Sequence, residues 1–347
     1  MGNNITCERC PAEQSIIRKC ISLEEKLKII EVKDLTKSYG EILAVNRISF
    51  DVRTGEIFGF LGPNGAGKTT TIRMLTGLSK PTAGSAQVLG FDVESEIVEA
   101  KKFIGVVPEA SNLYDELSAF DNLLFMAQLY GVSRSQRRAK AEELLKMFGL
   151  YEWRNHSFGT FSRGMKRALT IAAALIHNPK LLFLDEPTVG LDVMAARSLR
   201  NLVSDLRRQG VTIFLTTHYL EEADLLCDRI ALLVKGRIVK IDTPKSLKAF
   251  AEEEPVIEFS FNKIEPSIVG GLSEKLPELK VAAINQNILR VYGGTPANVL
   301  KVVLKYCEEK GIEIDAVKSI KPSLEDAFVK ITGLSPTIMA IEKGGRM

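Results

Sequence analysis

The segment from Gly62 to Thr69 constrains this chain more than any other stretch, because it fills every fixed position of the phosphate-binding loop pattern GxxxxGK(S/T). Its residues are Gly62, Pro63, Asn64, Gly65, Ala66, Gly67, Lys68 and Thr69. The apolar residues 56–61 before it predict a buried strand, and residues 70–75 after it have the spacing of a helix that stops at Gly77. Strand, glycine loop and helix therefore follow in the order that such a loop requires.

The residue types in this loop suit the phosphates of a nucleoside triphosphate. Glycines allow backbone N–H groups to close around phosphate oxygens, and the positive end of the following helix faces the same anion. We expect the Lys68 ammonium to reach the outer phosphates and the Thr69 hydroxyl to be a ligand for the magnesium ion that accompanies the nucleotide. Thr70 opens the expected helix and completes the binding segment.

A distant acidic pair supplies the second half of the expected site. The apolar residues 181–184 predict a strand that delivers Asp185 and Glu186 at its carboxyl end, where ligands bind in open α/β sheets. We expect Asp185 to contact magnesium, directly or from the second shell of ligands. Glu186 has the position of a base that orients and polarises the attacking water.

The rest of the first 245 residues alternates between strand and helix patterns, which predicts a parallel α/β sheet. Further strands are expected over residues 103–107 and 211–215, a helix over 193–208, and a closing hairpin over 230–234 and 238–241. Partly alternating apolar residues over 27–40 and 42–52 predict a small antiparallel sheet.

Residues 116–176 have helical patterns and are expected to form a separate helical region. Within it, Ser133 to Gln136 has the spacing of a capping box at the start of a helix that reaches Met147. Pro81 to Ser85 predicts a turn.

Periodicity restarts after residue 255 and predicts a smaller α+β module. Its expected elements are strands over 257–261, 288–292 and 312–320 and helices over 296–311 and 322–331. The predicted organisation is a leader without stable structure (1–26), a nucleotide-binding domain (27–245) with its helical subdomain at about 110–176, an accessory domain (255–333) and a loose tail (334–347).

Charge and hydropathy exclude several classes of protein. A net charge of +3 and the lack of a basic patch with interleaved aromatic residues argue against a nucleic-acid partner. The longest apolar runs fall far short of the roughly 20 residues that a membrane-spanning helix needs. Residues 1–29 lack the apolar block of a secretory signal, so we expect the protein on the cytoplasmic side.

In motif order, residues 30–242 resemble the ATP-binding cassette (ABC) ATPases, which power membrane transporters. The resemblance implies a P-loop NTPase core with an antiparallel β subdomain and a helical subdomain, binding ATP and Mg²⁺. It implies that Tyr39 stacks on adenine, that Asp192 in Gly190-Leu191-Asp192 couples two ATP sites, and that His218 contacts the γ-phosphate.

Two segments depart from the family pattern. Phe161 to Met165 falls at the position of the family's Leu-Ser-Gly-Gly-Gln signature, and Ser162 and Gly164 match it while Arg163 and Met165 do not. By resemblance, Ser162 and Gly164 contact the γ-phosphate. Glu109 stands where many cassettes have a glutamine near magnesium, and it adds negative charge beside the metal.

The resemblance also implies partners. In this family the signature of one protomer completes the phosphate-loop site of the other, so one set of motifs implies a homodimer that encloses two ATP molecules. Residues 322–328 resemble the C-terminal module of export ATPases of the daunorubicin-resistance type, as does the segment Phe161 to Met165. That branch implies a separate integral membrane permease, bound through residues 110–157, and a location on the cytoplasmic face of the membrane.

Two alternatives remain open: an importer ATPase with a regulatory C-terminal domain, and a non-transport ABC-type ATPase. A signalling GTPase is disfavoured, because the nearest match to its Asn-Lys-x-Asp loop, Asn262 to Glu265, fails at the last position and lies outside the core. The leader contains a CxxC pair, Cys7 and Cys10, that lacks enough neighbouring ligands for a zinc site.

Overall fold

A six-stranded sheet forms the centre of the computed structural model, which describes residues 28–252, 255–320, 323–334 and 339. Its strand order is β10-β9-β3-β8-β7-β6, with all neighbours parallel except β10 and β9. The strands are β3 (Ile57–Leu61), β6 (Ile104–Val107), β7 (Leu181–Asp185), β8 (Thr212–Thr217), β9 (Arg229–Val234) and β10 (Arg237–Asp242). The inner strands β3, β7 and β8 are buried throughout, as continuous apolar runs predict.

The second sheet is antiparallel and has the order β2-β1-β4-β5. Its strands are β1 (Lys28–Tyr39), β2 (Ile42–Arg53), β4 (Ala83–Val88) and β5 (Phe91–Asp92). Aromatic rings fill the space between the two sheets: Phe50 of β2 stacks on Phe58 of β3, with their ring centroids 5.6 Å apart. Rings in such offset contacts stabilise a core beyond the area they bury.

The turn predicted for residues 81–85 is wrong in its second half, because Ala83 already pairs with Thr36 of β1. Gly84 has φ +82°, and a Cβ there would lie 2.2 Å from the backbone oxygen of Asp34. The glycine that indicates a turn in the sequence instead allows β4 to approach β1 closely.

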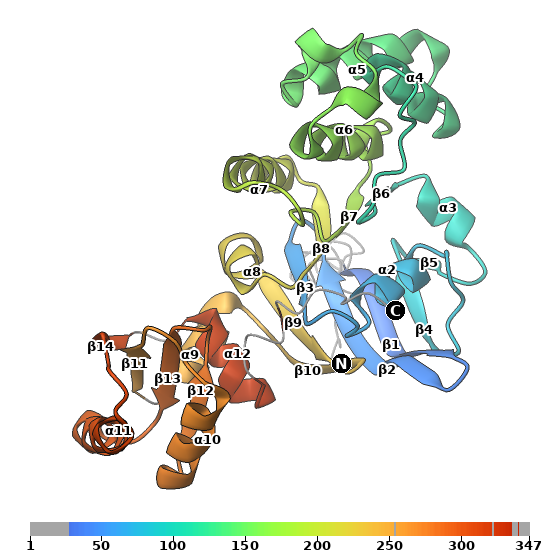
Figure 1. The fold of residues 1–347 in the computed structure, drawn as a ribbon. Helices are drawn as coiled ribbons and strands as arrows, with labels where there is room; N and C mark the ends of the chain where they lie inside the picture. Colours follow the sequence, from blue (N-terminus) through green and yellow to red (C-terminus); the bar gives the residue numbers. More distant parts are fainter. Residues whose placement is uncertain (1–27, 253–254, 321–322, 335–338, 340–347) are drawn as a thin grey trace, which may run out of the picture.

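Helices cover the central sheet and form a separate cluster at one end of the molecule (Figure 1). They are α2 (Lys68–Leu75), α3 (Ile97–Lys101), α4 (Ala119–Leu129), α5 (Arg134–Met147), α6 (Arg163–Leu175), α7 (Val193–Arg208) and α8 (Leu220–Leu226), with 3₁₀ turns η1 (Tyr151–Trp153) and η2 (Phe158–Thr160). The capping box predicted at Ser133 is wrong: this side chain caps no N–H group and lies near Ser135. Ser118, by contrast, accepts a hydrogen bond from the N–H of Asp121 at the start of α4.

The C-terminal module has a four-stranded antiparallel sheet of order β12-β13-β11-β14 with helices packed on it. Its elements are β11 (Val256–Ser260), α10 (Pro266–Lys275), β12 (Lys280–Ala283), β13 (Ile288–Tyr292), α11 (Pro296–Lys310), β14 (Ala316–Ile320) and α12 (Leu324–Thr332). The helix α9 (Pro244–Glu252) joins this module to β10. The sequence did not predict α9, α10 or β12.

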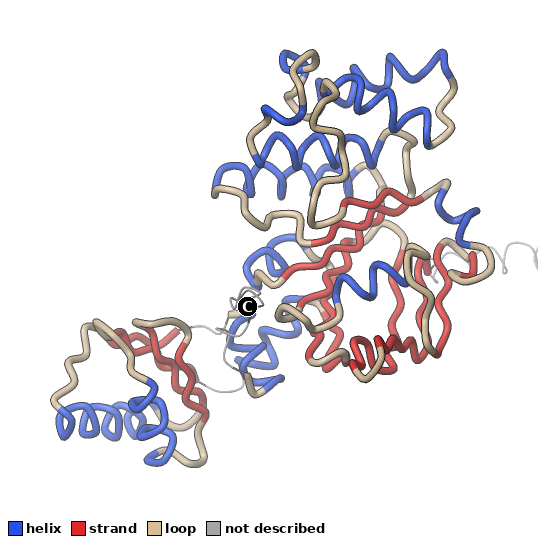
Figure 2. The backbone as a smooth tube through the Cα atoms, turned by 45° about the vertical axis from the view of Figure 1, so that its right-hand side comes forward, coloured by secondary structure: helices blue, strands red, loops and turns tan. Residues whose placement is uncertain are grey.

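Helix α12 links the module to the ATPase core. Its residues Leu324, Ala327 and Phe328 are buried in the same apolar cluster as Leu247 and Ala251 of α9. Figure 2 shows the module set apart from the central sheet, with α9 and α12 between them. Helix α12 therefore packs as part of both units.

Candidate nucleotide-binding site

The phosphate loop connects β3 to α2, and two of its glycines are dictated by the packing around it. A Cβ on Gly62 would lie 2.2 Å from the backbone oxygen of Leu233, and one on Gly67 would lie 2.5 Å from that of Ala44. Gly67 also has φ +104°, a conformation that side chains disfavour. The backbone can therefore turn sharply from strand into helix, leaving the first N–H groups of α2 free of helical partners.

Lys68 lies buried at this loop, with 6% of its surface exposed. Its Nζ donates hydrogen bonds to the backbone oxygens of Gly62 and Pro63, at 2.5 and 3.1 Å. The same atom lies 3.0 Å from Oε1 of Glu186, although the two residues are far apart in the sequence. The cation of the loop and the acid after β7 therefore share one site.

Asp185 ends β7 and accepts hydrogen bonds from two hydroxyl groups. Thr216 donates to its Oδ1 at 2.6 Å, and Thr69 donates to the same atom at 3.3 Å. Burial raises the pKa of Asp185, and the nearby charges of Glu186 and Glu109 raise it further, while the two hydroxyl groups lower it. This grouping of a hydroxyl with carboxylates matches the hard oxygen ligands that Mg²⁺ prefers, so the residues present fit that ion.

Glu186 follows Asp185 and has φ +47°, which is unusual for a residue with a side chain. Its N–H donates to Thr216, and its Oε2 lies 2.9 Å from Nδ1 of His218. Burial alone would raise the pKa of Glu186, but the hydrogen bond from His218 and the positive charge of Lys68 lower it overall. Glu186 is therefore held as a carboxylate in a buried position.

Glu109 follows β6, and its side chain is exposed. Its backbone oxygen accepts a hydrogen bond from Nη1 of Arg167 at 3.3 Å. Its charge contributes to the raised pKa of Asp185, so the two carboxylates are close enough to interact. The structure thus brings Glu109 toward the acidic pair.

Ser162, Gly164 and Asp192 form a second group, where α6 and α7 begin. Ser162 accepts a hydrogen bond from the N–H of Met165, and Asp192 accepts one from the N–H of Ala195. A Cβ on Gly164 would lie 3.0 Å from Cβ of Ala195, so this glycine allows the two helices to approach. Within the part of the chain that the structure describes, the hydrogen bonds of Ser162 and Asp192 are to the first turns of α6 and α7 and not to the Lys68–Glu186 pair.

Tyr39 lies at the end of β1 with 45% of its surface exposed. Nζ of Lys37 lies 5.0 Å from its ring centroid, and its hydroxyl lies 3.5 Å from that of Ser79. A face of an exposed ring of this kind is accessible to a planar partner.

Three residues of the site were missed by the sequence reasoning: Arg167, Thr216 and Glu222. Thr216 contacts both Asp185 and Glu186, and Glu222 accepts a hydrogen bond from Thr217 at 2.6 Å. A threonine in an apolar strand is the one signal that could have found Thr216. Arg167 and Glu222 sit on helices, where charged residues are common and carry no such signal.

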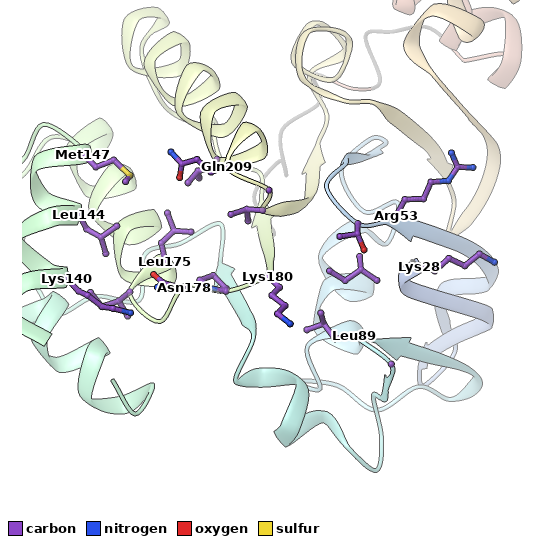
Figure 3. A pocket seen from close by; sticks show the side chains of 18 of the residues that line it. Lys28, Arg53, Leu89, Lys140, Leu144, Met147, Leu175, Asn178, Lys180 and Gln209 are labelled. Atoms are coloured by element: carbon purple, nitrogen blue, oxygen red, sulfur yellow. The ribbon is translucent and has the colours of Figure 1, made fainter. Parts of the chain in front are cut away.

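A large groove of about 1760 Å³ lies elsewhere on the molecule. Figure 3 shows Lys140, Leu144 and Met147 on one side of it and Lys28 and Arg53 on the other. It adjoins the residues before β7 and β8, at the opposite edge of the sheet from Asp185, and so it is not the phosphate site.

The fold and the grouping of Lys68, Thr69, Asp185 and Glu186 define a P-loop nucleoside triphosphatase. Residues 45–189 match the family described as ABC transporter. The chain is 34% identical over 308 residues to the linearmycin resistance ATP-binding protein LnrL of Bacillus subtilis, covering 88% of this chain and 98% of that protein. The chain therefore belongs to the ATP-binding subunits of the ABC transporter family, and it binds and hydrolyses ATP.

Other relatives agree with this membership. The doxorubicin resistance ATP-binding protein DrrA of Mycobacterium tuberculosis is 37% identical over 87% of this chain and 93% of its own length. The Nod factor export ATP-binding protein I of a Rhizobium species is 38% identical over 88% of this chain and 97% of its own length. The solved structure of the ATP-binding cassette MJ0796 is a dimer in a post-hydrolysis state with ADP and phosphate. It matches this chain with a TM-score of 0.57 and 29% identity, over 62% of this chain and 98% of that chain.

No helix within the described ranges is long and apolar enough to cross a membrane. Within the same ranges, no group of three or more histidine, cysteine or acidic residues could hold a metal ion alone. The leader with Cys7 and Cys10 lies outside the described residues.

Proposed function

We propose that this chain is the ATP-hydrolysing subunit of an exporter and drives a separate membrane permease. The observation that carries the proposal is that Glu186 contacts both Lys68 and His218. Its Oε1 lies 3.0 Å from Nζ of Lys68, and its Oε2 lies 2.9 Å from Nδ1 of His218. Phosphoryl transfer to water requires a cation that binds the phosphates and a base that orients the attacking water. Lys68 and Glu186 have these properties, and His218 is hydrogen-bonded to the base.

Each residue has a role that its surroundings support. Lys68 would bind the outer phosphates, because its ammonium is already held at the mouth of the loop. Glu186 would orient and deprotonate the attacking water, since it is held as a carboxylate. His218 would fix the orientation of that carboxylate and contact the γ-phosphate.

Thr69, Asp185 and Glu109 would hold Mg²⁺ together with the phosphates. When bound, Mg²⁺ neutralises charge on the phosphate oxygens. Mg²⁺ keeps waters and substrate phosphates among its ligands, so these residues would supply only part of its coordination shell. Tyr39 would stack on the adenine, and Gly62 to Thr70 would enclose the phosphates.

One set of motifs per chain supports a homodimer in the ATP-bound state. Ser162, Gly164 and Asp192 lie together at the starts of α6 and α7, where their contacts are to their own helices. We propose that this group meets the phosphate loop of a second copy, so that ATP closes the dimer and hydrolysis releases it. The dimeric form of the related cassette MJ0796 supports this arrangement.

The export direction rests on the relatives, whose names include resistance to linearmycin and doxorubicin and export of Nod factor. We propose a cytoplasmic, peripheral location on the membrane, bound to the permease through the helical region 110–157 beside Glu109. An importer ATPase whose C-terminal module senses substrate is the alternative. Purification with a permease that works without a substrate-binding protein favours export, and dependence of transport on such a protein favours import.

The experiment that tests this function is the Glu186→Gln variant. We expect it to bind ATP with unchanged affinity, to lose turnover by about 1,000-fold and to elute as an ATP-dependent dimer in size-exclusion chromatography. A monomeric variant with normal turnover would contradict the proposal. Glu221→Gln, an exposed neighbour of the site on α8, is the matched control and should hydrolyse ATP normally.

A further inference from the structure

Arg167 is a buried cation on α6 that no motif of the phosphate site includes. It has 8% of its surface exposed, and its side chain reaches away from its own helix. Every hydrogen bond that it donates in the described structure goes to a backbone oxygen, in two separate segments. A buried guanidinium needs well-placed partners, because burying a charge is costly.

The first segment contains the acidic pair. Nη2 of Arg167 donates to the backbone oxygen of Asp185 at 2.7 Å, and Nε donates to that of Pro187 at 2.9 Å. These two oxygens flank Glu186 in the chain. One planar group therefore holds the carbonyl groups of the residues on both sides of Glu186.

Glu186 is the residue that needs such support. Its φ of +47° lies in the left-handed region, which costs a residue with a side chain about 1 kcal/mol or more. A conformation of this kind persists when its surroundings fix it. Arg167 supplies two of the fixing bonds, and Thr216 supplies another through the N–H of Glu186.

The second segment follows β6. Nη1 of Arg167 donates to the backbone oxygen of Pro108 and, at 3.3 Å, to that of Glu109. One side chain from α6 is thus bonded both to the loop that carries Glu109 and to the loop that carries Glu186. Arg167 itself lies on α6, which begins at the signature segment with Ser162 as its cap. The Arg167 side chain therefore connects both loops to this helix.

We propose that Arg167 is a positioning residue for ATP hydrolysis. It holds the backbone of Glu186 in the left-handed conformation and couples this residue to the Glu109 loop and to α6. This inference rests on the proposed role of Glu186 as the base. A shift of α6 or of the Glu109 loop moves the guanidinium, and the carbonyl groups on either side of Glu186 move with it.

The charge and shape of arginine both suit this role. Burial lowers the pKa of Arg167 more than the charges of Asp185 and Glu109 raise it, to about 10, so the side chain stays protonated at neutral pH. A lysine has no planar fork and cannot reach several carbonyl groups in fixed directions. Arg167→Lys therefore keeps the charge and removes the geometry.

The test measures kcat and KM for ATP in Arg167→Lys and Arg167→Ala. We expect kcat to fall by about 100-fold in both variants, with KM changed by less than about twofold, because the phosphate loop is untouched. A low, non-denaturing concentration of guanidinium ion should restore part of the turnover of Arg167→Ala. Unchanged kcat in folded variants, or failure of both variants to fold, would overturn the proposal.

Arg207 provides the matched control. Its Nε and Nη2 donate hydrogen bonds to the carboxylate of Asp228 at 3.0 and 2.7 Å, remote from the phosphate loop. Arg207→Lys should leave kcat unchanged. The double variant Arg167→Lys with Glu186→Gln should turn over no more slowly than Glu186→Gln, since one residue acts through the other. Additive losses would overturn the role of Arg167.

These outcomes separate the two roles. Normal turnover in Glu186→Gln would overturn the proposed base. Lost turnover in Glu186→Gln with normal turnover in Arg167→Lys would overturn the positioning role alone.

Discussion

Nζ of Lys68 lies 3.0 Å from Oε1 of Glu186, and both side chains are almost completely buried. The loop that binds phosphate and the acid proposed as base thus form an ion pair. Because a buried charge is stable only with a partner, the two residues depend on each other. ATP phosphates would offer Lys68 a second partner and leave Glu186 available to water.

Removing one member of this pair should destabilise the protein. Lys68→Met leaves the Glu186 carboxylate buried without its ammonium partner, and we expect the free energy of unfolding to fall by about 3 kcal/mol. Urea denaturation measures this loss. The double variant Lys68→Met with Glu186→Gln should recover most of it, and a double variant as unstable as Lys68→Met would refute the pairing argument.

Glu222 should make stability depend on pH in a defined direction. Burial raises its pKa above 4.5, although hydrogen bonds from Thr217 and Thr188 lower it. The folded protein thus holds this proton more tightly than the unfolded chain. The resulting stability is fully present below the unfolded pKa and is lost as the pH rises through the folded pKa.

Glu222→Gln keeps a neutral side chain at every pH. Above that window we expect its free energy of unfolding to exceed that of the natural protein by on the order of 1 kcal/mol, with no difference below about pH 4. Denaturation across this pH range measures the effect. Glu221→Gln, exposed on the same helix, is the control and should show no such window.

Glu109 should affect magnesium dependence more than ATP affinity. Its charge acts on Asp185, so Glu109→Gln removes a negative charge near the proposed metal ligands. We expect the Mg²⁺ concentration for half-maximal turnover to rise by about fivefold, since the interaction of two unit charges about 4 Å apart in water is worth about 1 kcal/mol. An unchanged magnesium titration would count against the role, and exposed Glu116→Gln is the control.

Helix α12 should contribute to the stability of the ATPase core. Phe328 is fully buried among residues of that core, and Phe328→Ala should lower the free energy of unfolding by about 3–5 kcal/mol. Thermal denaturation followed through the ATPase domain measures the loss. Val317→Ala, at a half-exposed position of β14, should lower the free energy of unfolding far less. Equal losses in the two variants would contradict the contribution of α12 to the stability of the core.

The sequence by itself determined the phosphate loop, the strand that delivers Asp185 and Glu186, and the α/β fold of the ATPase. Each of these is a local pattern: glycines at fixed spacing, or an apolar run ending in acids. Even the departures at Glu109 and Arg163 are visible by position. Helix α7, expected over 193–208, has those bounds in the structure because its apolar stripe ends there, Asp192 caps its start and Gly210 follows its end.

Only the tertiary structure decided which remote groups support these patterns. Arg167 binds backbone oxygens of two other segments, and Gly84 belongs to a strand because β1 pairs with it. Helix α12 serves two units because its buried side chains meet α9. Hydrogen bonds to backbone carbonyls place no demand on the identity of the residue that accepts them, so they leave no pattern in the sequence.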